Sequence, residues 1–391
     1  MRRALFAVGL LALAASVTAV LAAPKGQPRG DQGAVHFVRG APTAFEPFIA
    51  RRNPTYGAFL RQHVWRLVAY SPYFDSRTRW YPNAWAYDDA YAIYRRSRLA
   101  ARHADWILRD GAGRPLFIPY GCGNGVCPQY AADISNPAFR RHWIADARAK
   151  LHHRYRGLFV DDVNMEFRVG NGSEDDVAPI DRATGRPMTY DAWRGYMARF
   201  MQEIRAALPR AEIVHNAIWF ADAPARAADP SIRRQIQAAD YVALERGFND
   251  SGLTGGGGAF SISALLAYID AVHALGKGVV LDGEAEDVRG MEYELAAYLL
   301  ISEGNDLVSA HGMTPTHWWS GFDVNLGDAL GRRERWHGLL RRDFSGGMVL
   351  LNEPDSPTRS VTLPSPMRDL NGRALSSVTL AAASGVVVKR A

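Results

Sequence analysis

The sequence predicts an α/β fold, a (β/α)8 TIM barrel with a small C-terminal antiparallel β domain. Eight short apolar runs recur between residues 35 and 309, and segments with helical spacing of apolar residues lie between them. From about residue 341 the pattern changes to short strands punctuated by prolines. We therefore expect a signal peptide at 1–22, a barrel over 33–340 and a β-rich domain over 341–391.

The apolar runs are the expected barrel strands, and the segments between them include the expected helices. In chain order the runs are Val35–Val38, Val64–Tyr70, Trp106–Leu108, Gly157–Val160, Glu212–Asn216, Tyr241–Glu245, Gly278–Asp282 and Asp306–Ser309. Helices are expected at Pro137–Leu151, Tyr190–Leu208, Ile262–Leu275 and Glu292–Glu303. An open dinucleotide-binding sheet is the alternative, but no G-x-G-x-x-G follows the first run.

The C-terminal segment predicts a compact set of antiparallel strands. Asp343–Asn352 has strand alternation on both sides of Gly346 and Gly347, which indicates a β-hairpin. Prolines then separate further short strands, and the chain closes with the apolar run Gly385–Val388.

The first 22 residues have the pattern of a signal peptide. Arg2 and Arg3 precede an apolar run from Ala4 to about Ala22 that ends in small residues suited to cleavage. A membrane anchor is the alternative, because the run approaches the ~20 residues of a spanning helix. We expect export and cleavage, with a mature chain that is secreted or periplasmic and not inserted in the membrane.

The composition is that of a globular protein, with 48% hydrophobic and 22% charged residues. The formal net charge is +6, which raises the question of nucleic-acid binding. Two of the arginines leave with the signal peptide, and no block of five or six basic residues occurs. We expect a monomer with no nucleic-acid partner.

The two cysteines, Cys122 and Cys127, flank a glycine-rich loop. Half of a metal site is one interpretation, but no other cysteine is present to complete four thiolates. Disulfides persist in exported proteins, so the sequence predicts a local disulfide that holds this loop in shape.

Carboxylates follow several of the predicted strands. Asp161 and Asp162 end the fourth, Glu245 ends the sixth, and Asp282 and Glu284 end the seventh. In a barrel the C-terminal strand ends carry the chemistry, although helix caps or salt bridges would account for any single acid. Since side chains alternate along a strand, only one of Asp161 and Asp162 should face the mouth. Glycosidic bond cleavage needs two carboxyl groups, which strands four and six would supply.

Aromatic and polar side chains after the strands are candidates for contacts with a sugar. The predicted substrate-binding residues are Tyr70, Asn164, Asn216, Trp219, Asp282, His311, Trp318 and Trp319. Flat rings at the barrel mouth would stack on pyranose rings. The alternative for Trp318 and Trp319 is that they fill the space between the barrel and the C-terminal domain, and a lone histidine is equally often structural.

Three segments carry a resemblance to a known family. Gly157–Asn164, Trp318–Gly327 and Arg342–Asn352 are similar to the hypothetical glycosyl-hydrolase-like family 15, and the resemblance extends over roughly residues 35–390. It implies a barrel fold and glycosidase activity. In related barrels the aspartate on strand four is the nucleophile and the acid comes from a later strand. The resemblance thus implies Asp161 as nucleophile and Glu245 as acid/base. From the alternation along the strand, Asp162 is expected to orient its neighbour. The Glu-x-Glu cluster at 284–286 departs from the better-known families and makes Glu284 a rival acid.

The leading hypothesis is an exported glycoside hydrolase that acts on a polysaccharide or oligosaccharide with retention of configuration. Retention is expected because the longer Glu245 side chain should reach Asp161 across the mouth. A barrel that binds carbohydrate without cutting it, in exopolysaccharide or cell-envelope metabolism, is the alternative. A deacetylase is a third class, but its metal signature is missing, and we expect neither metal nor cofactor.

Overall fold

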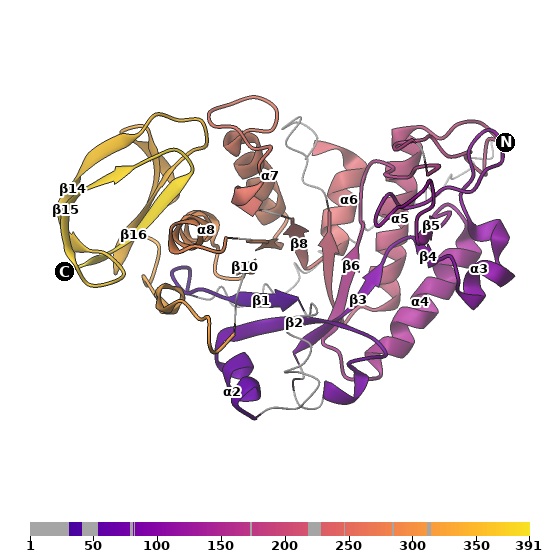
Figure 1. The fold of residues 1–391 in the computed structure, drawn as a ribbon, viewed down its shortest axis with the longest axis horizontal. Coiled ribbons are helices and arrows are strands. Elements are labelled where there is room, and N and C mark those ends of the chain that lie inside the picture. The colour runs from indigo at the N-terminus through magenta and orange to yellow at the C-terminus, as the bar shows by residue number, and fades with distance from the viewer. Residues whose placement is uncertain are drawn as a thin grey trace, which may run out of the picture.

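A closed parallel barrel of eight strands forms the centre of the molecule and confirms the predicted fold class (Figure 1). The computed structural model describes residues 31–40, 54–78, 81, 83–172, 174–217, 228–245, 247–283, 285–310 and 314–391. The predicted signal peptide lies outside these residues. In their order around the barrel, the strands are β1 (Phe37–Gly40), β2 (Val64–Tyr70), β3 (Ala84–Asp89), β6 (Gly157–Asp161), β7 (Glu212–Asn216), β8 (Tyr241–Leu244), β9 (Gly278–Leu281) and β10 (Leu307–Val308), which pairs with β1.

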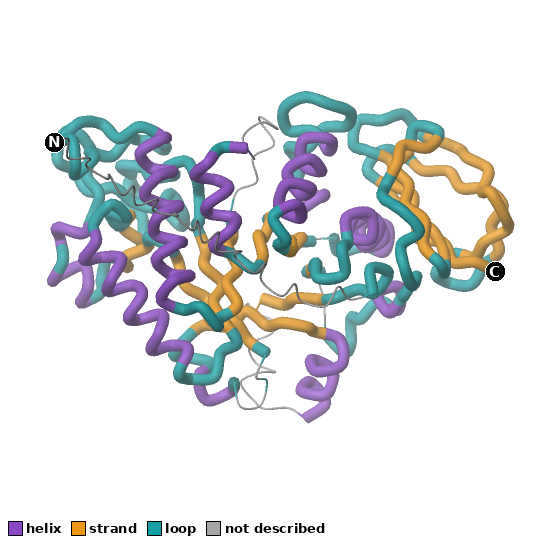
Figure 2. The backbone as a smooth tube through the Cα atoms, turned by 180° about the vertical axis from the view of Figure 1, so that it is seen from behind, coloured by secondary structure: helices purple, strands orange, loops and turns teal. Residues whose placement is uncertain are grey.

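Helices surround the strands, as the tube in Figure 2 shows. They are α2 (Pro54–His63), α3 (Arg98–Arg102), α4 (Pro137–Leu151), α5 (Tyr190–Ala207), α6 (Pro230–Ala238), α7 (Ile262–Ala274) and α8 (Val288–Ile301). Side chains that alternate along each strand divide the core in two. One set packs under the helices, and the other fills the barrel interior with residues such as Val38, Trp85, Val214 and Val280. None of the helices in the described ranges has the length and apolarity needed to cross a membrane.

The third barrel strand is not where the sequence pattern placed it. Trp106–Leu108 was expected to be that strand, but Trp106 ends a 3-10 helix and Ile107 makes one isolated bridge, to Ala132. The strand is Ala84–Asp89, whose alternation of alanine with aromatic residues lacks the β-branched residues typical of strands. Trp85 and Tyr87 turn inward, while the small alanines pack beneath the helices.

A long excursion separates β3 from α4 and contains the predicted disulfide. Strands β4 (Ala92–Tyr94) and β5 (Gln129–Ala131) form a two-stranded antiparallel sheet within it. Cys122 and Cys127 are bonded to each other between Ile118 and β5, which confirms the expected disulfide. The excursion, which includes α3, lies beside α4 at the end of the molecule opposite the C-terminal sheet (Figure 1).

The C-terminal chain forms an antiparallel sheet of six strands. Their order is β11 (Glu334–Trp336), β12 (Leu339–Phe344), β13 (Gly347–Asn352), β16 (Ser384–Arg390), β14 (Arg359–Arg368) and β15 (Ala374–Leu380). Strands β12 and β13 make the hairpin that the sequence indicates.

Helix α8 joins the sheet to the barrel and is seen end-on beside β16 in Figure 1. Gly385 lies so close to this helix that a Cβ there would come within 2.7 Å of the Ala296 side chain. Arg342 is buried and donates to the carbonyl oxygens of Leu299, Leu300 and Ser302 at 3.1, 3.3 and 2.8 Å. A cation there stabilises the C-terminal end of the helix.

Candidate active site

Two carboxylates from different strands meet at one amide. Asp161 ends β6, Asn216 ends β7, and Glu245 follows β8. The Asn216 Nδ2 donates to Asp161 Oδ1 and to Glu245 Oε1, each at 2.7 Å. Because the strands of a parallel barrel all end on the same side, these three residues share the mouth. The amide holds the two carboxyl groups near each other and leaves Glu245 exposed to solvent.

Tyr87 gives Asp161 another partner. Its hydroxyl donates to Asp161 Oδ2, and the backbone N–H of Asp162 donates to Asp161 Oδ1 at 2.9 Å. Burial, with the nearby charge of Asp161, raises the pKa of Tyr87 well above its ordinary value, so its hydroxyl stays a donor. Tyr70, at the end of β2, contacts Tyr87 with ring centroids 4.8 Å apart. Donors from three positions thus orient the Asp161 carboxylate.

Asp162 has a different environment from Asp161. Its backbone takes the left-handed conformation, with φ of 54°, and Asn164 donates to its Oδ1 at 3.0 Å. Its carboxyl group is also hydrogen-bonded to that of Asp89, which ends β3. Burial and the charge of Asp161 raise the pKa of Asp162 to about 6, and burial together with Asp162 raises that of Asp89. Two carboxyl groups in this position share a proton.

A second group of polar residues lies across the mouth. Asp282 follows β9 and accepts a hydrogen bond from the Ser309 hydroxyl, after β10. On β1, Arg39 donates to the carbonyl oxygen of Ala310 at 3.2 Å, and its guanidinium interacts electrostatically with the Asp282 carboxylate. Burial lowers the pKa of this guanidinium. Polar side chains therefore line both halves of the mouth.

Glu294 of α8 ties two of the mouth loops together. It is buried and accepts hydrogen bonds from the Asn249 side chain and, at 2.8 Å, from the backbone N–H of Ala285. Asn249 follows Glu245, and Ala285 follows Asp282. Helix α8 therefore fixes the relative positions of the loops after β8 and β9.

The structure does not bring every candidate to this mouth. Trp219, Glu284 and His311 lie outside the described residues. Trp318 packs against Phe37 and Phe59, with ring centroids 5.3 and 5.5 Å apart, and Trp319 packs against Phe322. These contacts place Trp318 between β1 and α2, whereas Trp319 lies against the 3-10 turn at Ser320–Asp323. A further histidine, His215, turns outward to Gln235 of α6, and burial lowers its pKa to about 3.

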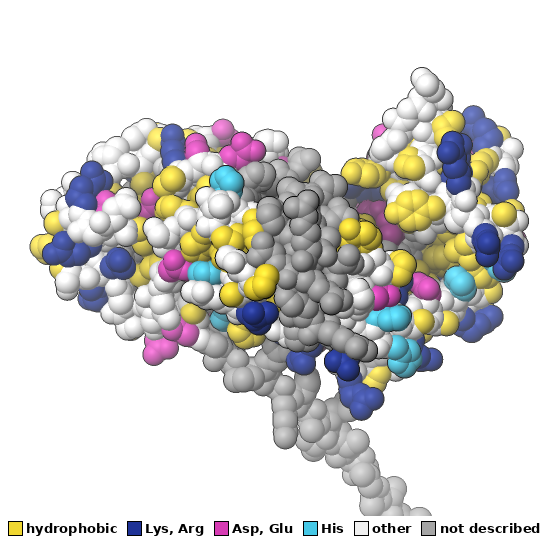
Figure 3. Space-filling model, turned by 60° about the horizontal axis from the view of Figure 1, so that its bottom comes forward, with side chains coloured by type: hydrophobic (Ala, Val, Ile, Leu, Met, Phe, Trp, Pro, Cys, Tyr) yellow, Lys and Arg dark blue, Asp and Glu magenta, His cyan; other side chains and the backbone are white. Residues whose placement is uncertain are grey.

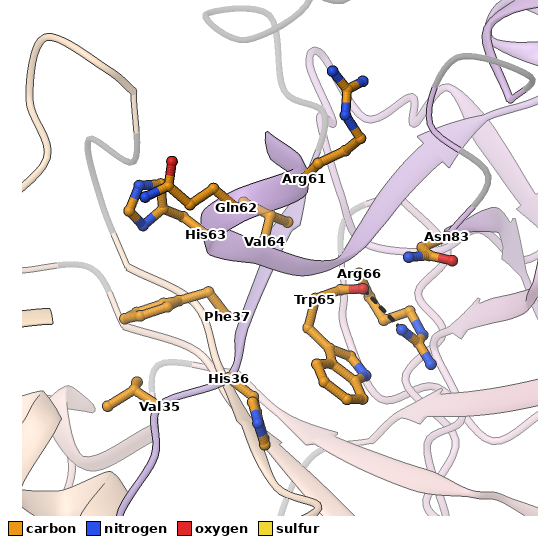
Figure 4. Close-up of a pocket in the computed structure, with 10 residues that line it drawn as sticks. All are labelled: Val35, His36, Phe37, Arg61, Gln62, His63, Val64, Trp65, Arg66 and Asn83. Carbon is orange, nitrogen blue, oxygen red and sulfur yellow. Dashed lines mark hydrogen bonds between the residues drawn. The ribbon is translucent and has the colours of Figure 1, made fainter. Parts of the chain in front are cut away.

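Two cavities lie at opposite ends of the barrel. One of about 200 Å³ adjoins Asp162 and is lined by Asn164, Glu166, Arg168 and Tyr190, among others. The larger, about 330 Å³, opens at the N-terminal strand ends and includes Trp65 and Asn83 (Figure 4). The larger cavity is thus remote from the carboxylates.

On the face in Figure 3, Lys and Arg side chains are scattered, with Asp and Glu side chains among them. Within the described ranges, no group of three or more His, Cys, Asp or Glu side chains is arranged to hold a metal ion.

The sequence pattern did not identify two residues of this site, Tyr87 and Asp89. Both lie on the strand that the pattern did not recognise. The signal was present, because Tyr87-Asp88-Asp89 ends β3 much as Asp161-Asp162 ends β6.

Comparison with known proteins agrees with this architecture. A family model described as hypothetical glycosyl hydrolase family 15 matches residues 70–348. The maltogenic α-amylase AmyB of Thermotoga neapolitana superposes with a TM-score of 0.50 at 11% identity, covering 92% of this chain and 98% of that one. A dextranase of Flavobacterium johnsoniae superposes with a TM-score of 0.51 at 11% sequence identity, covering 93% of this chain and 52% of that one.

The glycoside hydrolase domain of PelA from Pseudomonas aeruginosa is a further similar structure, with a TM-score of 0.42 and 16% identity. It covers 73% of this chain and 96% of that domain. None of the curated proteins matches the sequence. At these identities, the amylase and dextranase likenesses show the barrel fold and nothing finer.

Proposed function

The chain belongs to hypothetical glycosyl hydrolase family 15, and from this premise we propose that it is an exported hydrolase that cuts glycosidic bonds with retention of configuration. Its substrate is a polysaccharide or oligosaccharide. Asp161 is the nucleophile and Glu245 the acid/base. The Cys122–Cys127 disulfide supports export, because disulfides form and persist in oxidising compartments.

The shared amide of Asn216 is the observation that carries this proposal. Asp161 Oδ1 and Glu245 Oε1 are each 2.7 Å from the same nitrogen, so the two oxygens lie at most twice that distance apart. Any separation within that limit of about 5.4 Å is shorter than the ~6.5–9.5 Å that an inverting pair leaves for water, which supports a retaining pair at ~5–5.5 Å.

The surroundings of the two carboxyl groups suit different roles. Asp161 is oriented by three donors, so one of its oxygens is positioned to attack the anomeric carbon. Glu245 is exposed, so it reaches both a leaving-group oxygen and water. In the first step Glu245 protonates the leaving oxygen as Asp161 forms the glycosyl ester. In the second, Glu245 takes a proton from water, which attacks the anomeric carbon and releases Asp161.

The proposal is tested by incubating the purified mature protein with a panel of bacterial and plant polysaccharides and measuring released reducing ends. Asp161→Asn and Glu245→Gln should each lower turnover by several orders of magnitude with the fold retained. Asp162→Asn should have a smaller effect. Proton NMR of the first-formed anomer should show retention.

Other outcomes would change the assignment in defined ways. An active Asp161→Asn variant would remove the nucleophile, and an inverted product would make Asp161 a general base. Full activity in Glu245→Gln with loss in Glu284→Gln would transfer the acid to the loop after β9. Binding of a polymer without any release would favour a non-catalytic carbohydrate-binding barrel.

A further inference from the structure

Several tyrosines near Asp161 are exposed to solvent. The exposed fractions are 47% for Tyr70, 62% for Tyr94 and 74% for Tyr120. Large aromatic side chains gain free energy by burial, so a group of exposed rings on one surface commonly marks a binding site. Within the part of the chain that the structure describes, the phenols of Tyr94 and Tyr120 have no hydrogen-bond partner, which leaves them accessible to a ligand.

These three side chains are neighbours and lead to the carboxylate. Tyr70 contacts Tyr87, which donates to Asp161. Tyr94 pairs with Gln129, the Ile118 N–H donates to the carbonyl oxygen of Gln129, and the Tyr120 N–H donates to that of Ile118, so the backbone brings Tyr94 and Tyr120 together. Burial, and then electrostatic interactions with Asp161, Tyr94 and Tyr120, raise the pKa of Tyr70, which agrees with their proximity. The series therefore extends from the catalytic mouth outward to the disulfide loop.

The backbone holds the outer tyrosines in place. Tyr94 ends β4 and pairs with Gln129 of β5, and the next residue, Arg95, donates to the carbonyl oxygen of Pro128 at 3.0 Å. The disulfide then closes the loop that follows Tyr120. Both tyrosines thus belong to one braced segment.

The same segment is fastened to the loop that follows Asp161 and Asp162. Phe117 and Gly170 exchange two backbone hydrogen bonds, of 2.8 and 2.9 Å. Gly172 has φ of 93°, and a Cβ there would come within 2.0 Å of the carbonyl oxygen of Gly125. A surface held this way loses little conformational entropy when it binds a ligand.

The chemistry of the segment indicates which ligand it fits. Residues 116–132, which include Tyr120 and both cysteines, carry no charged side chain. A tyrosine offers a flat apolar face and one hydroxyl, which complement the C–H face and the hydroxyl groups of a pyranose ring. Exposed charges of both signs flank it, Arg96 beside Tyr94 and Glu174–Asp176 on the neighbouring loop, so no single sign of charge favours an ionic ligand. An uncharged sugar chain therefore fits this surface better than a charged one.

We propose that Tyr70, Tyr94 and Tyr120 form a tyrosine platform that binds consecutive units of a neutral polysaccharide and leads the chain across Asp161, where it is cut internally. The disulfide-braced excursion then has a role: it binds sugar units beyond those that the two catalytic carboxylates contact. This inference rests on the proposed function for the cleavage step, but binding to the platform does not depend on cleavage.

Binding is measured with the mature protein carrying Asp161→Asn, so that the polymer stays intact. Native gels containing dextran, soluble starch, galactomannan or mixed-linkage β-glucan provide neutral probes, and alginate provides a charged one. At least one neutral polymer should retard the protein. Tyr94→Ala and Tyr120→Ala should each weaken that retardation about five- to ten-fold, whereas Tyr94→Phe should retain most of it because stacking uses the ring.

Trp65→Ala is the matched control, because Trp65 is 44% exposed but belongs to the cavity at the other end of the barrel. Its affinity should stay within two-fold of the parent. Circular dichroism shows whether each variant is folded. Equal affinity in folded Tyr94→Ala and Tyr120→Ala variants, an equal loss in Trp65→Ala, stronger retardation by alginate, or no retardation by any neutral polymer would each overturn the platform.

The platform and the proposed function fail in distinguishable ways. If the wild-type protein binds a polymer through the tyrosines but releases no reducing ends, the hydrolase fails and the platform stands. If it cuts a polymer and the two alanine variants cut it with the same kcat/KM, the hydrolase stands and the platform is wrong. When both hold, early products should be long oligosaccharides, and the variants should raise KM with kcat little changed.

Discussion

Glu212 lies at the base of the barrel, on the same strand that carries Asn216 to the mouth. Both of its oxygens are paired with Arg66, at 2.8 and 2.9 Å, and it also accepts from Trp85 Nε1 at 2.9 Å and Arg156 Nε at 3.0 Å. Glu212 and Arg66 are 6% and 8% exposed, so their charges are largely removed from water. Replacing Glu212 by glutamine leaves the guanidinium of Arg66 buried with a neutral partner.

Breaking a buried ion pair in this way costs about 3–5 kcal/mol of unfolding free energy. A change of 1 kcal/mol shifts Tm by ~2–4 °C in chains of 150–250 residues, and this chain is longer, so we expect Glu212→Gln to lower Tm by about 6–10 °C. Urea unfolding followed by tryptophan fluorescence measures the same loss. The double variant Arg66→Met/Glu212→Leu should recover part of it, because neither buried charge of the pair remains. Recovery is incomplete because Trp85 Nε1 loses its acceptor, whereas the Arg156 side chain, 56% exposed, is hydrated instead.

Arg114 provides the control, since its side chain is 60% exposed and pairs with Asp110 on the surface. Arg114→Met should cost no more than about 1 kcal/mol. The sign of the pH dependence follows from Glu212 itself. Burial opposes ionisation, but hydrogen bonds from Arg66, Trp85 and Arg156 outweigh it and lower the pKa. The stabilisation is therefore present above the unfolded pKa of ~4.3 and is lost as pH falls below it. A loss in Glu212→Gln no larger than in Arg114→Met would refute this reasoning.

Three further predictions concern the mouth and the C-terminal sheet. Tyr87→Phe removes a donor that orients the proposed nucleophile, and misplacement of a reacting group costs up to about 100-fold, so kcat should fall by about 10- to 100-fold; an unchanged kcat in steady-state assays would contradict it. The pKa values of Asp162, raised to about 6, and of Asp89, also raised, mean that their stabilisation is complete below the unfolded pKa of ~3.9 and is lost as pH rises through the folded pKa of each. Asp89→Asn should therefore flatten the decline of Tm between pH 5 and 7 in a thermal-shift series. If Tm falls with pH equally in the variant and the wild-type protein, the two carboxyl groups do not share a proton. Arg342→Met removes three hydrogen bonds at the end of α8 and should cost about 2–4 kcal/mol in urea unfolding; a loss below 1 kcal/mol would show that packing alone holds the sheet.

The local order of residues along the chain determined much of this protein. Strand alternation predicted different partners for Asp161 and Asp162, and in the structure Asp161 meets Asn216 while Asp162 meets Asn164. The left-handed backbone of Asp162, just after the end of β6, separates the two side chains there. Parallel strands end on one side of a barrel, so acids after β6 and β8 had to share that side whatever the loops do. The helices at 137–151 and 190–207 likewise follow from caps and spacing that lie within the segments themselves.

Other features depend on contacts between residues far apart in the chain. Ala84–Asp89 pairs with β2 and β6 to close the barrel, and within it only Trp85 and Tyr87 favour a strand locally, since alanine and aspartate are depleted in strands. Tyr87 and Asp89 therefore reach the site only through closure of the barrel. The two tryptophans at 318 and 319 looked suited to sugar stacking, but whether an aromatic ring meets a ligand or a core depends on what packs beside it. A pattern in sequence sets which way a side chain points from its own backbone; only the tertiary structure decides what it meets there.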